Sequence, residues 1–354
     1  MESLRKPQNL IILAFIIAAG GVLALSALNT SVNLAPRAEV RCIIGSEKDD
    51  FLDNTQVQRL LLTRYQLEVD YSEAGSIEQV MLPESQLTDI DCLWPSNTSA
   101  EQIFNIEKPN ISASSEVIFN SPIVLYTWDD VYRGMDASGL LEQTPDGYTT
   151  VDMERLTTLM TSRPGWDTLN VNRFSNFRII TTDPTQSNSG NMFYALYLNM
   201  LSGGGVATQA DLTEHIGTIS DYYLAQGLME NSSGDLFDQY VTQGAGAVPI
   251  MANYESLLVE LSVANPDLGE RIRSSIRLLY PVPTVYSSHP LIALTDAGER
   301  LSDALKDPDI QQLAWEQHGF RTAVPGIVNN PDILEGVTLP PTDDLTFILP
   351  LPRP

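Results

Sequence analysis

The sequence predicts an α/β protein built around mainly parallel strands. It has 354 residues, of which 43% are hydrophobic and 18% charged, enough for two domains with buried cores. Short apolar runs typical of strands alternate with segments of helical periodicity. Several of these runs end in loops rich in glycine and serine, the pattern of βα units around a parallel sheet.

The N-terminal third contains the clearest alternation. The run VRCII reads as a short buried strand, QLEVDY alternates like a strand, and IDCLW and SPIVLYTW are again apolar. Pro122 stands at the entry of the last run, where a missing N–H is tolerated. We therefore expect strands at residues 40–44, 66–71, 90–94 and 121–128, and helices at residues 50–65 and 77–82.

The remainder of the chain continues in the same class up to residue 322. We expect strands at residues 177–181, 244–251, 277–280 and 291–294, and helices at residues 153–160, 191–200, 212–227, 232–243, 254–263, 296–305 and 309–318. From Ala323 the sequence is proline-rich and lacks periodicity. Residues 326–354 are accordingly expected to form an extended or loosely packed tail.

The N-terminus predicts export. Leu10–Leu28 contains no charged residue and is long enough as a helix to cross a bilayer, and Arg5 and Lys6 before it keep that end cytoplasmic. The length of the run favours an uncleaved anchor. The alternative is a signal peptide cleaved after the small residues Ala24–Ser26. Residues 1–35 are thus a cytoplasmic stub, anchor or signal segment and linker, and the main domain is extracytoplasmic in both cases.

Composition restricts the partners. Acidic residues outnumber basic ones 45 to 20, giving a formal net charge of -25, so nucleic-acid binding is not expected.

The chain has two cysteines, Cys42 and Cys92. In an exported protein they form a candidate disulfide, and two buried free thiols are the alternative.

Enzyme signatures are missing from the sequence. It has no G-x-S-x-G elbow, Walker A sequence, H-E-x-x-H or G-x-G-x-x-G after a strand. The three histidines, His215, His289 and His318, stand in unrelated contexts. We therefore predict a protein that is not an enzyme and that carries no metal or cofactor.

Polar loops follow several predicted strands. Ser46, Ser76, Ser96 and the run Ser187–Gly190 all lie where a strand gives way to a helix. Ligands in α/β sheets bind outside the carboxyl ends of strands, where helix N-termini offer free N–H groups. One serine there is commonly a helix cap, but four such loops suggest a shared polar cleft.

Carboxylates stand near these loops. Glu47, Glu73 and Glu255 are either charges that favour a helix N-terminus or contacts to a cationic or hydrogen-bond-donating ligand.

These landmarks, taken in order, resemble a known family. They are GSEK (45–48), AGS (74–76), WPSN (94–97), SPIVL (121–125), TDPTQSNSG (182–190) before an aromatic-bearing helix, YES (254–256), LYPVP (279–283) and AWEQHGFR (314–321). The order resembles bacterial extracellular solute-binding proteins of the sulfate/molybdate-like branch. The resemblance covers residues 41–321, and it rests on the order of the motifs rather than on any single one.

The resemblance implies a type II periplasmic-binding-protein fold with an N-terminal transmembrane helix. One lobe would comprise residues 36–126 and a return segment 284–325, and residues 127–283 would form the other. A small polar solute, an oxyanion in this branch, would lie between the lobes and be passed to an ABC-type membrane permease. The residues implied to hold it are Ser46, Ser76, Ser96, Ser121, Ser187, Ser189 and Tyr254, with Tyr280 as a weaker candidate.

Two departures leave alternatives open. The strong negative charge suits an oxyanion poorly, and Lys48 and Arg173 are the basic residues nearest the loops. A permanent anchor with a proline-rich tail also fits a membrane-tethered binding module for sensing or complex assembly rather than transport. A hydrolase would need a nucleophile paired with a base, and the sequence suggests no such pair.

Overall fold

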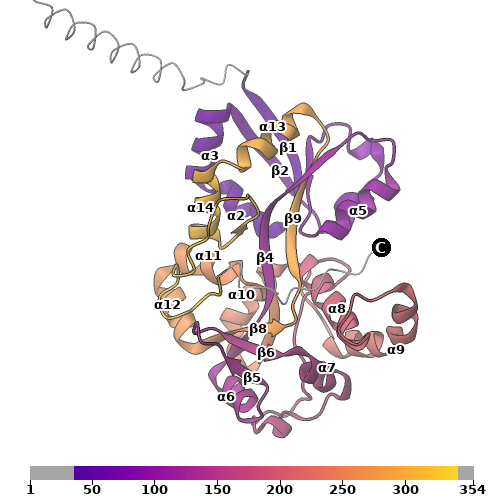
Figure 1. Cartoon of the computed structure of the whole chain (residues 1–354), viewed down its shortest axis with the longest axis vertical. Coiled ribbons are helices and arrows are strands. Elements are labelled where there is room, and N and C mark those ends of the chain that lie inside the picture. The colour runs from indigo at the N-terminus through magenta and orange to yellow at the C-terminus, as the bar shows by residue number, and fades with distance from the viewer. Residues whose placement is uncertain (1–35, 342–354) are drawn as a thin grey trace, which may run out of the picture.

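Two long strands connect the two halves of the molecule (Figure 1). The computed structural model describes residues 36–341. Strand β4 (Ser114–Trp128) pairs with β9 (Tyr286–Ala293) along its first half and with β7 (Ile250–Tyr254) and β8 (Ile276–Val282) along its second half. The chain therefore forms two lobes, called lobe 1 (top of Figure 1) and lobe 2 (bottom).

Lobe 1 contains three parallel strands in the order β2-β1-β3, followed by β9, which runs antiparallel to its neighbours β3 and β4. Its further elements are β1 (Ala38–Ile44), η2 (Ser46–Lys48), α2 (Asp49–Asp53), α3 (Thr55–Leu60), η3 (Leu61–Tyr65), β2 (Leu67–Glu73), α4 (Ser76–Met81), η4 (Glu84–Gln86), β3 (Cys92–Trp94), α5 (Thr98–Glu107), α13 (Asp296–Leu305), α14 (Pro308–His318) and β10 (Arg321–Thr322).

Lobe 2 is assembled around the second half of β4, with β7 and β8 antiparallel to it and β6 parallel to β8. Its further elements are α6 (Asp129–Ala137), β5 (Leu141–Gln143), β6 (Thr149–Asp152), α7 (Met153–Ser162), η5 (Trp166–Leu169), α8 (Asn188–Leu201), α9 (Gln209–Gln226), α10 (Ser233–Gln243), η6 (Gly244–Gly246), α11 (Ser256–Ala264) and α12 (Pro266–Ser275).

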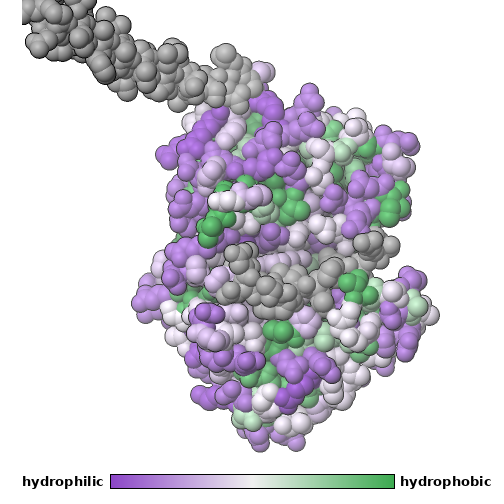
Figure 2. All heavy atoms as spheres, viewed as in Figure 1, coloured by the Kyte–Doolittle hydropathy of each residue, from purple (hydrophilic) through white to green (hydrophobic). Residues whose placement is uncertain are grey.

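Each lobe buries its own apolar core. In lobe 1 the rings of Phe119 and Phe320 stack with centroids 5.0 Å apart, and Phe51 packs edge-on against Phe119. In lobe 2 the fully buried Trp166 and Tyr197 belong to a second, larger cluster. Hydrophilic residues cover most of the face shown in Figure 2, and hydrophobic ones form separate small groups there.

Several local predictions are corrected by tertiary context. The expected helix at residues 50–65 is divided at Asn54, whose side chain caps α3. Residues 177–181 are not a strand, since only Ile180 makes an isolated bridge, to Met251. The sheets are mixed rather than mainly parallel. Helices α5, α6 and α12 and strands β5 and β6 were not expected.

The segment after β10 packs against lobe 2. Leu334 and Leu339 are buried in its core, the Trp315 indole N–H donates to the Asn330 carbonyl at 2.7 Å, and Arg273 Nε donates to the Glu335 carbonyl at 3.1 Å. A loosely packed tail is therefore wrong for the described part of the segment, up to residue 341. The rest of the predicted tail lies outside the described residues.

The two cysteines form a disulfide. Cys42 and Cys92 lie opposite each other on the neighbouring strands β1 and β3. The alternative of two free thiols is therefore wrong.

The membrane prediction falls on a part of the chain that the structure does not describe. Between residues 36 and 341, no helix is long and apolar enough to cross a bilayer. The apolar run Leu10–Leu28 lies outside the described residues.

Candidate functional site

A cleft of about 220 Å³ lies where the two lobes meet. Lobe 1 contributes the loops that follow β1, β2 and β3, and lobe 2 contributes the segments that lead into α8 and α10. Its lining is polar throughout, apart from Gly45, Ala74 and Gly75: Ser46, Glu47, Glu73, Ser76, Glu78, Ser96, Gln186, Ser187, Asn188, Asn231 and Ser232.

Four of the seven predicted ligand-binding residues line this cleft. Ser46, Ser76 and Ser96 come from lobe 1 and Ser187 from lobe 2. The Ser96 backbone N–H donates to Ser76 Oγ at 2.8 Å, which fixes two of the strand-end loops together. Ser187 precedes α8 but its side chain makes no cap hydrogen bond; its Oγ lies 3.4 Å from the hydroxyls of Ser189 and Ser233.

The other three predicted residues lie behind the cleft surface. Ser189 is fully buried and its hydroxyl is hydrogen-bonded to Thr182 and Ser233. The Tyr254 hydroxyl accepts from Asn188 Nδ2 at 2.8 Å, and burial raises the pKa of Tyr254 well above its ordinary value. Ser121 is buried within β4. None of them contributes to the lining.

Asn188 joins the two lobes directly. Its amide Nδ2 donates to the Ser96 carbonyl at 3.0 Å, and its Oδ1 accepts from Asn97 Nδ2. Nearby, a Cβ placed on Gly75 of lobe 1 would lie 2.3 Å from the Gln186 carbonyl oxygen of lobe 2. The lobes are therefore in contact along one side of the cleft.

A buried ion pair supports the lobe 1 side. Lys48 Nζ donates to Glu47 Oε1 at 2.5 Å and to Ser96 Oγ at 2.8 Å, and Ser96 Oγ also donates to Glu47. Burial acts to raise the pKa of Glu47, but the charge of Lys48 and contact with His289 outweigh it and hold that pKa below its ordinary range. Burial lowers the pKa of Lys48, and the Glu47 charge opposes this.

His289 lies between Glu47 and Ser287, the order found in hydrolytic triads. Its Nδ1 is 3.4 Å from Glu47 Oε1 and its Nε2 is 3.3 Å from Ser287 Oγ. Ser287, however, is fully buried and gives its one hydroxyl proton to the Ser96 carbonyl. This arrangement orients Ser96 and does not present a nucleophile to the cleft.

A second buried ion pair lies away from the cleft. Arg321 on β10 forms two hydrogen bonds to Glu255, at 2.7 and 2.9 Å, and the Tyr280 hydroxyl donates to Glu255 at 2.5 Å. Glu255 and Tyr280 are therefore committed to this cluster, which connects β10 of lobe 1 to lobe 2.

Sequence reasoning missed several lining residues. Asn231 and Ser232 precede α10, but this helix follows another helix, so the strand-to-helix pattern did not mark them. Glu78 lies within α4, where a carboxylate near a helix N-terminus is common. Asn188 stood inside a motif that was recognised, yet only its serine neighbours were selected.

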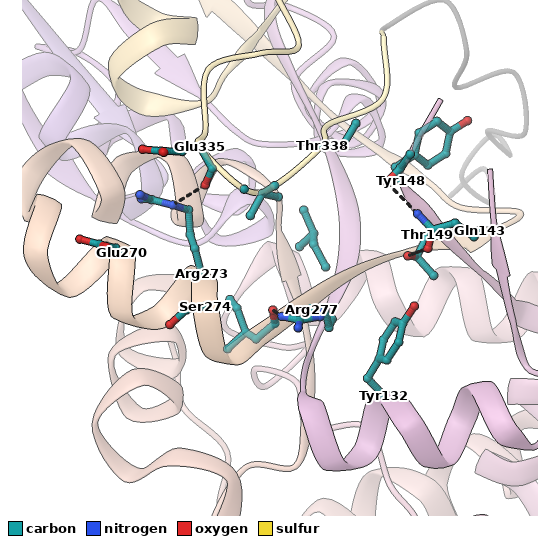
Figure 3. A pocket seen from close by; sticks show the side chains of 15 residues that line it. Tyr132, Gln143, Tyr148, Thr149, Glu270, Arg273, Ser274, Arg277, Glu335 and Thr338 are labelled. Carbon is teal, nitrogen blue, oxygen red and sulfur yellow. Dashed lines mark hydrogen bonds between the residues drawn. The ribbon is translucent and has the colours of Figure 1, made fainter. Parts of the chain in front are cut away.

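A larger cavity of about 560 Å³ lies elsewhere on lobe 2 (Figure 3). It is formed between β6, β8, α12 and the C-terminal segment, with Tyr132, Thr149, Arg273 and Thr338 around it. No strand-to-helix loop opens into it, and Arg273 is occupied by the Glu335 carbonyl. The interlobe cleft is therefore the better candidate site.

The fold is shared with solved binding proteins, although no protein-family model and no curated protein matches the sequence. The chain is similar to the sulfate-binding protein SubI from Mycobacterium tuberculosis, with a TM-score of 0.54 and 14% identity over 82% of this chain and 88% of that one. It is also similar to iron-bound HitA from Pseudomonas aeruginosa, with a TM-score of 0.57 and 12% identity over 88% and 92%.

A third similar structure is the periplasmic binding protein AfuA from Actinobacillus pleuropneumoniae with fructose-6-phosphate bound, at a TM-score of 0.53 and 11% identity over 83% of this chain and 87% of that one. Together these structures define the class: the chain has the two-lobed α/β fold of periplasmic binding proteins. They are a sulfate-binding protein, a protein with fructose-6-phosphate bound and an iron-bound protein, so they do not single out the sulfate/molybdate-like branch.

Proposed function

We propose that this chain is an extracytoplasmic solute-binding protein that closes its two lobes on a small polar solute and delivers it to an ABC-type importer. The observation that carries the proposal is the convergence of loops from both lobes on one polar cleft. Hydroxyls, amides and helix N-termini are suited to orienting a small solute. Structurally similar proteins are named as binders of small solutes, which supports this reading.

We propose that the hinge lies in the middle of β4 and in the connection between β8 and β9. Strand β4 changes partners between Pro122 and Ile123, and residues 283–285 join β8 to β9. Rotation about two such crossings opens and closes a cleft between lobes.

Binding is tested on the full chain, purified in mild detergent, by a thermal-shift screen. The panel contains oxyanions, amino acids, organic amines, sugars and divalent metals. A solute that binds only the folded state stabilises it by about 2.7 kcal/mol at one hundred times its dissociation constant. We expect a rise in melting temperature with one class of solute.

Two serine variants then locate the binding site. Ser187→Ala removes a hydroxyl that lines the cleft and is expected to weaken binding of that solute, by about 1 kcal/mol or fivefold. Ser275→Ala, at an exposed position outside the cleft, is the control. A well-folded protein that binds nothing in the panel, or whose binding is unaffected by Ser187→Ala and Gly75→Ala, would contradict the proposal.

A further inference from the structure

The cleft lining carries carboxylates and no basic side chain. Glu47, Glu73 and Glu78 line it, and the remaining lining residues are glycine, alanine, hydroxyls and amides. Glu73 and Glu78 are exposed, and neither forms an ion pair with any residue in the described range 36–341. Their charges therefore act on whatever enters the cleft.

The nearest cation is not available to a solute. The Lys48 side chain is fully buried, and its ammonium group is shared between Glu47 Oε1 and Ser96 Oγ. To bind an anion, Lys48 would have to leave a buried partner, which uncovers the charge of Glu47. Lys48 thus balances Glu47 and leaves Glu73 and Glu78 without a counter-charge.

Glu47 also presents an unused acceptor. Its side chain is only 5% exposed, and Oε1 receives all of its hydrogen bonds. Oε2 accepts none from any residue that the structure describes. Oε2 is not one of the buried atoms that lack a partner, and Glu47 lines the cleft, so this oxygen is free to accept a hydrogen bond from a donor on the solute.

One feature of the cleft favours the opposite charge. The N-terminus of α8 provides about half a positive charge; the Ser187 side chain does not cap it, although Thr182 Oγ1 accepts from the Gly190 N–H at 2.8 Å. Two unpaired carboxylates outweigh it. The burial of neighbouring Asp49, together with the charges of Asp50, Glu73 and Glu47, raises the pKa of Asp49 to about 6, as expected beside a negative cleft.

The cleft lining suits an organic cation better than a metal ion. Residues 36–341 contain no group of three or more His, Cys, Asp or Glu side chains placed to hold a metal ion. An ammonium group needs only hydrogen-bond acceptors, and it tolerates carboxylates that come from separate elements. The α8 terminus and Ser187 suit an oxygen acceptor elsewhere on the same solute.

We infer that the solute carries an ammonium-type group, attracted by the carboxylates of Glu47, Glu73 and Glu78, and is not a free oxyanion. This inference rests on the proposed function, because it names the class of solute for the same cleft. It predicts a selectivity opposite to that expected from the sulfate/molybdate-like resemblance.

The experiment measures binding by calorimetry for two sets of probes at equal ionic strength. One set is ethanolamine, choline, putrescine and lysine, and the other is sulfate, phosphate and molybdate. Binding is compared between the native chain, the double variant Glu73→Gln/Glu78→Gln and the control Glu84→Gln/Glu107→Gln. The control removes the same net charge from exposed positions of lobe 1 outside the cleft.

We expect at least one ammonium probe to bind, with affinity reduced about tenfold or more by the cleft variant and unchanged by the control. Binding should also weaken as salt is added. Binding of an oxyanion that the cleft variant leaves intact or strengthens would overturn the inference while the proposed function stands. If no probe of either set binds, the inference is overturned, and the proposed function falls with it only if the thermal-shift panel, which also contains sugars and divalent metals, yields no binder either.

Discussion

Gly75 is the position where closure of the cleft can be tested most directly. Its backbone angles, φ -61° and ψ 149°, are accessible to any residue, so no special conformation requires glycine there. Glycine is required at this position because of a contact with the other lobe. A Cβ added to Gly75 would lie 2.3 Å from the Gln186 carbonyl oxygen. Real Cβ contacts are essentially never shorter than 3.0 Å, and the obstructing atom is backbone.

Gly75→Ala should therefore act as a wedge between the lobes. The methyl group clashes only when lobe 1 and lobe 2 are in contact, so the open form is unaffected. Overpacking of this kind costs about 1–3 kcal/mol. If that cost falls on the closed form alone, the apparent affinity for a solute bound between the lobes falls about 5- to 150-fold.

Distance measurements between the lobes provide an assay that needs no solute. The chain's only two cysteines form a disulfide, so Glu84→Cys in lobe 1 and Glu214→Cys in lobe 2 supply unique sites for spin labels. Gly75→Ala should shift the distance distribution toward longer separations. Gly205→Ala is the matched control, because an added Cβ there meets nothing within 4 Å.

The same variants then enter calorimetry with a solute that binds the native chain. Unchanged distances and unchanged affinity for Gly75→Ala would refute the reasoning, because the lobes would then not approach as the structure has them.

Three further predictions concern stability. Replacing Cys42 and Cys92 with alanine opens a loop closed across 50 residues and should lower the free energy of unfolding by about 4 kcal/mol in denaturant titrations, and a loss below about 1 kcal/mol would contradict this. Glu255→Gln leaves Arg321 buried without its carboxylate and should cost about 3–5 kcal/mol. Adding Arg321→Met should recover part of that cost, and a double variant no more stable than the single would argue against a coupled pair. Burial, together with the charge of Lys48, lowers the pKa of His289 to about 4. Between pH 6.5 and 4 the unfolded chain therefore binds a proton that the native chain does not. The free energy of unfolding should fall by up to about 3 kcal/mol as the pH drops through that window. His289→Gln should flatten this part of the stability profile, and an unchanged slope would show that His289 is not responsible.

Local sequence patterns were sufficient to predict the strands and serines on the lobe 1 side of the cleft. The strands β1 and β3 are short and apolar, and each is followed by a serine that the structure places on the cleft surface, Ser46 and Ser96. These predictions succeed because a buried strand accepts few side chains other than apolar ones, and because the chain must form a turn where the strand ends. The same reasoning failed at residues 177–181, where apolar composition resembled a strand but only one bridge forms.

Long-range contacts explain what sequence reasoning did not find. Glu47 and Lys48 stand in a turn, where two adjacent charges are normally exposed. They are buried because His289 and Ser96, from distant parts of the chain, close over them. The sequence around Arg321 did not indicate that it forms a buried ion pair either, since its partner Glu255 lies 66 residues away.

Helix geometry decides which serines of the recognised 182–190 motif can meet a solute. Ser187 immediately precedes α8, while Ser189 is its second residue. Ser187 has extended backbone angles outside the helix, whereas Ser189 is fixed by the helix itself. Ser187 lines the cleft, and its Oγ also lies 3.4 Å from the hydroxyls of Ser189 and Ser233. Ser189 does not line the cleft and is hydrogen-bonded to Thr182 and Ser233 behind it. A serine-rich loop therefore divides its hydroxyls between binding and support, and Ser187→Ala should weaken solute binding where Ser189→Ala lowers stability instead.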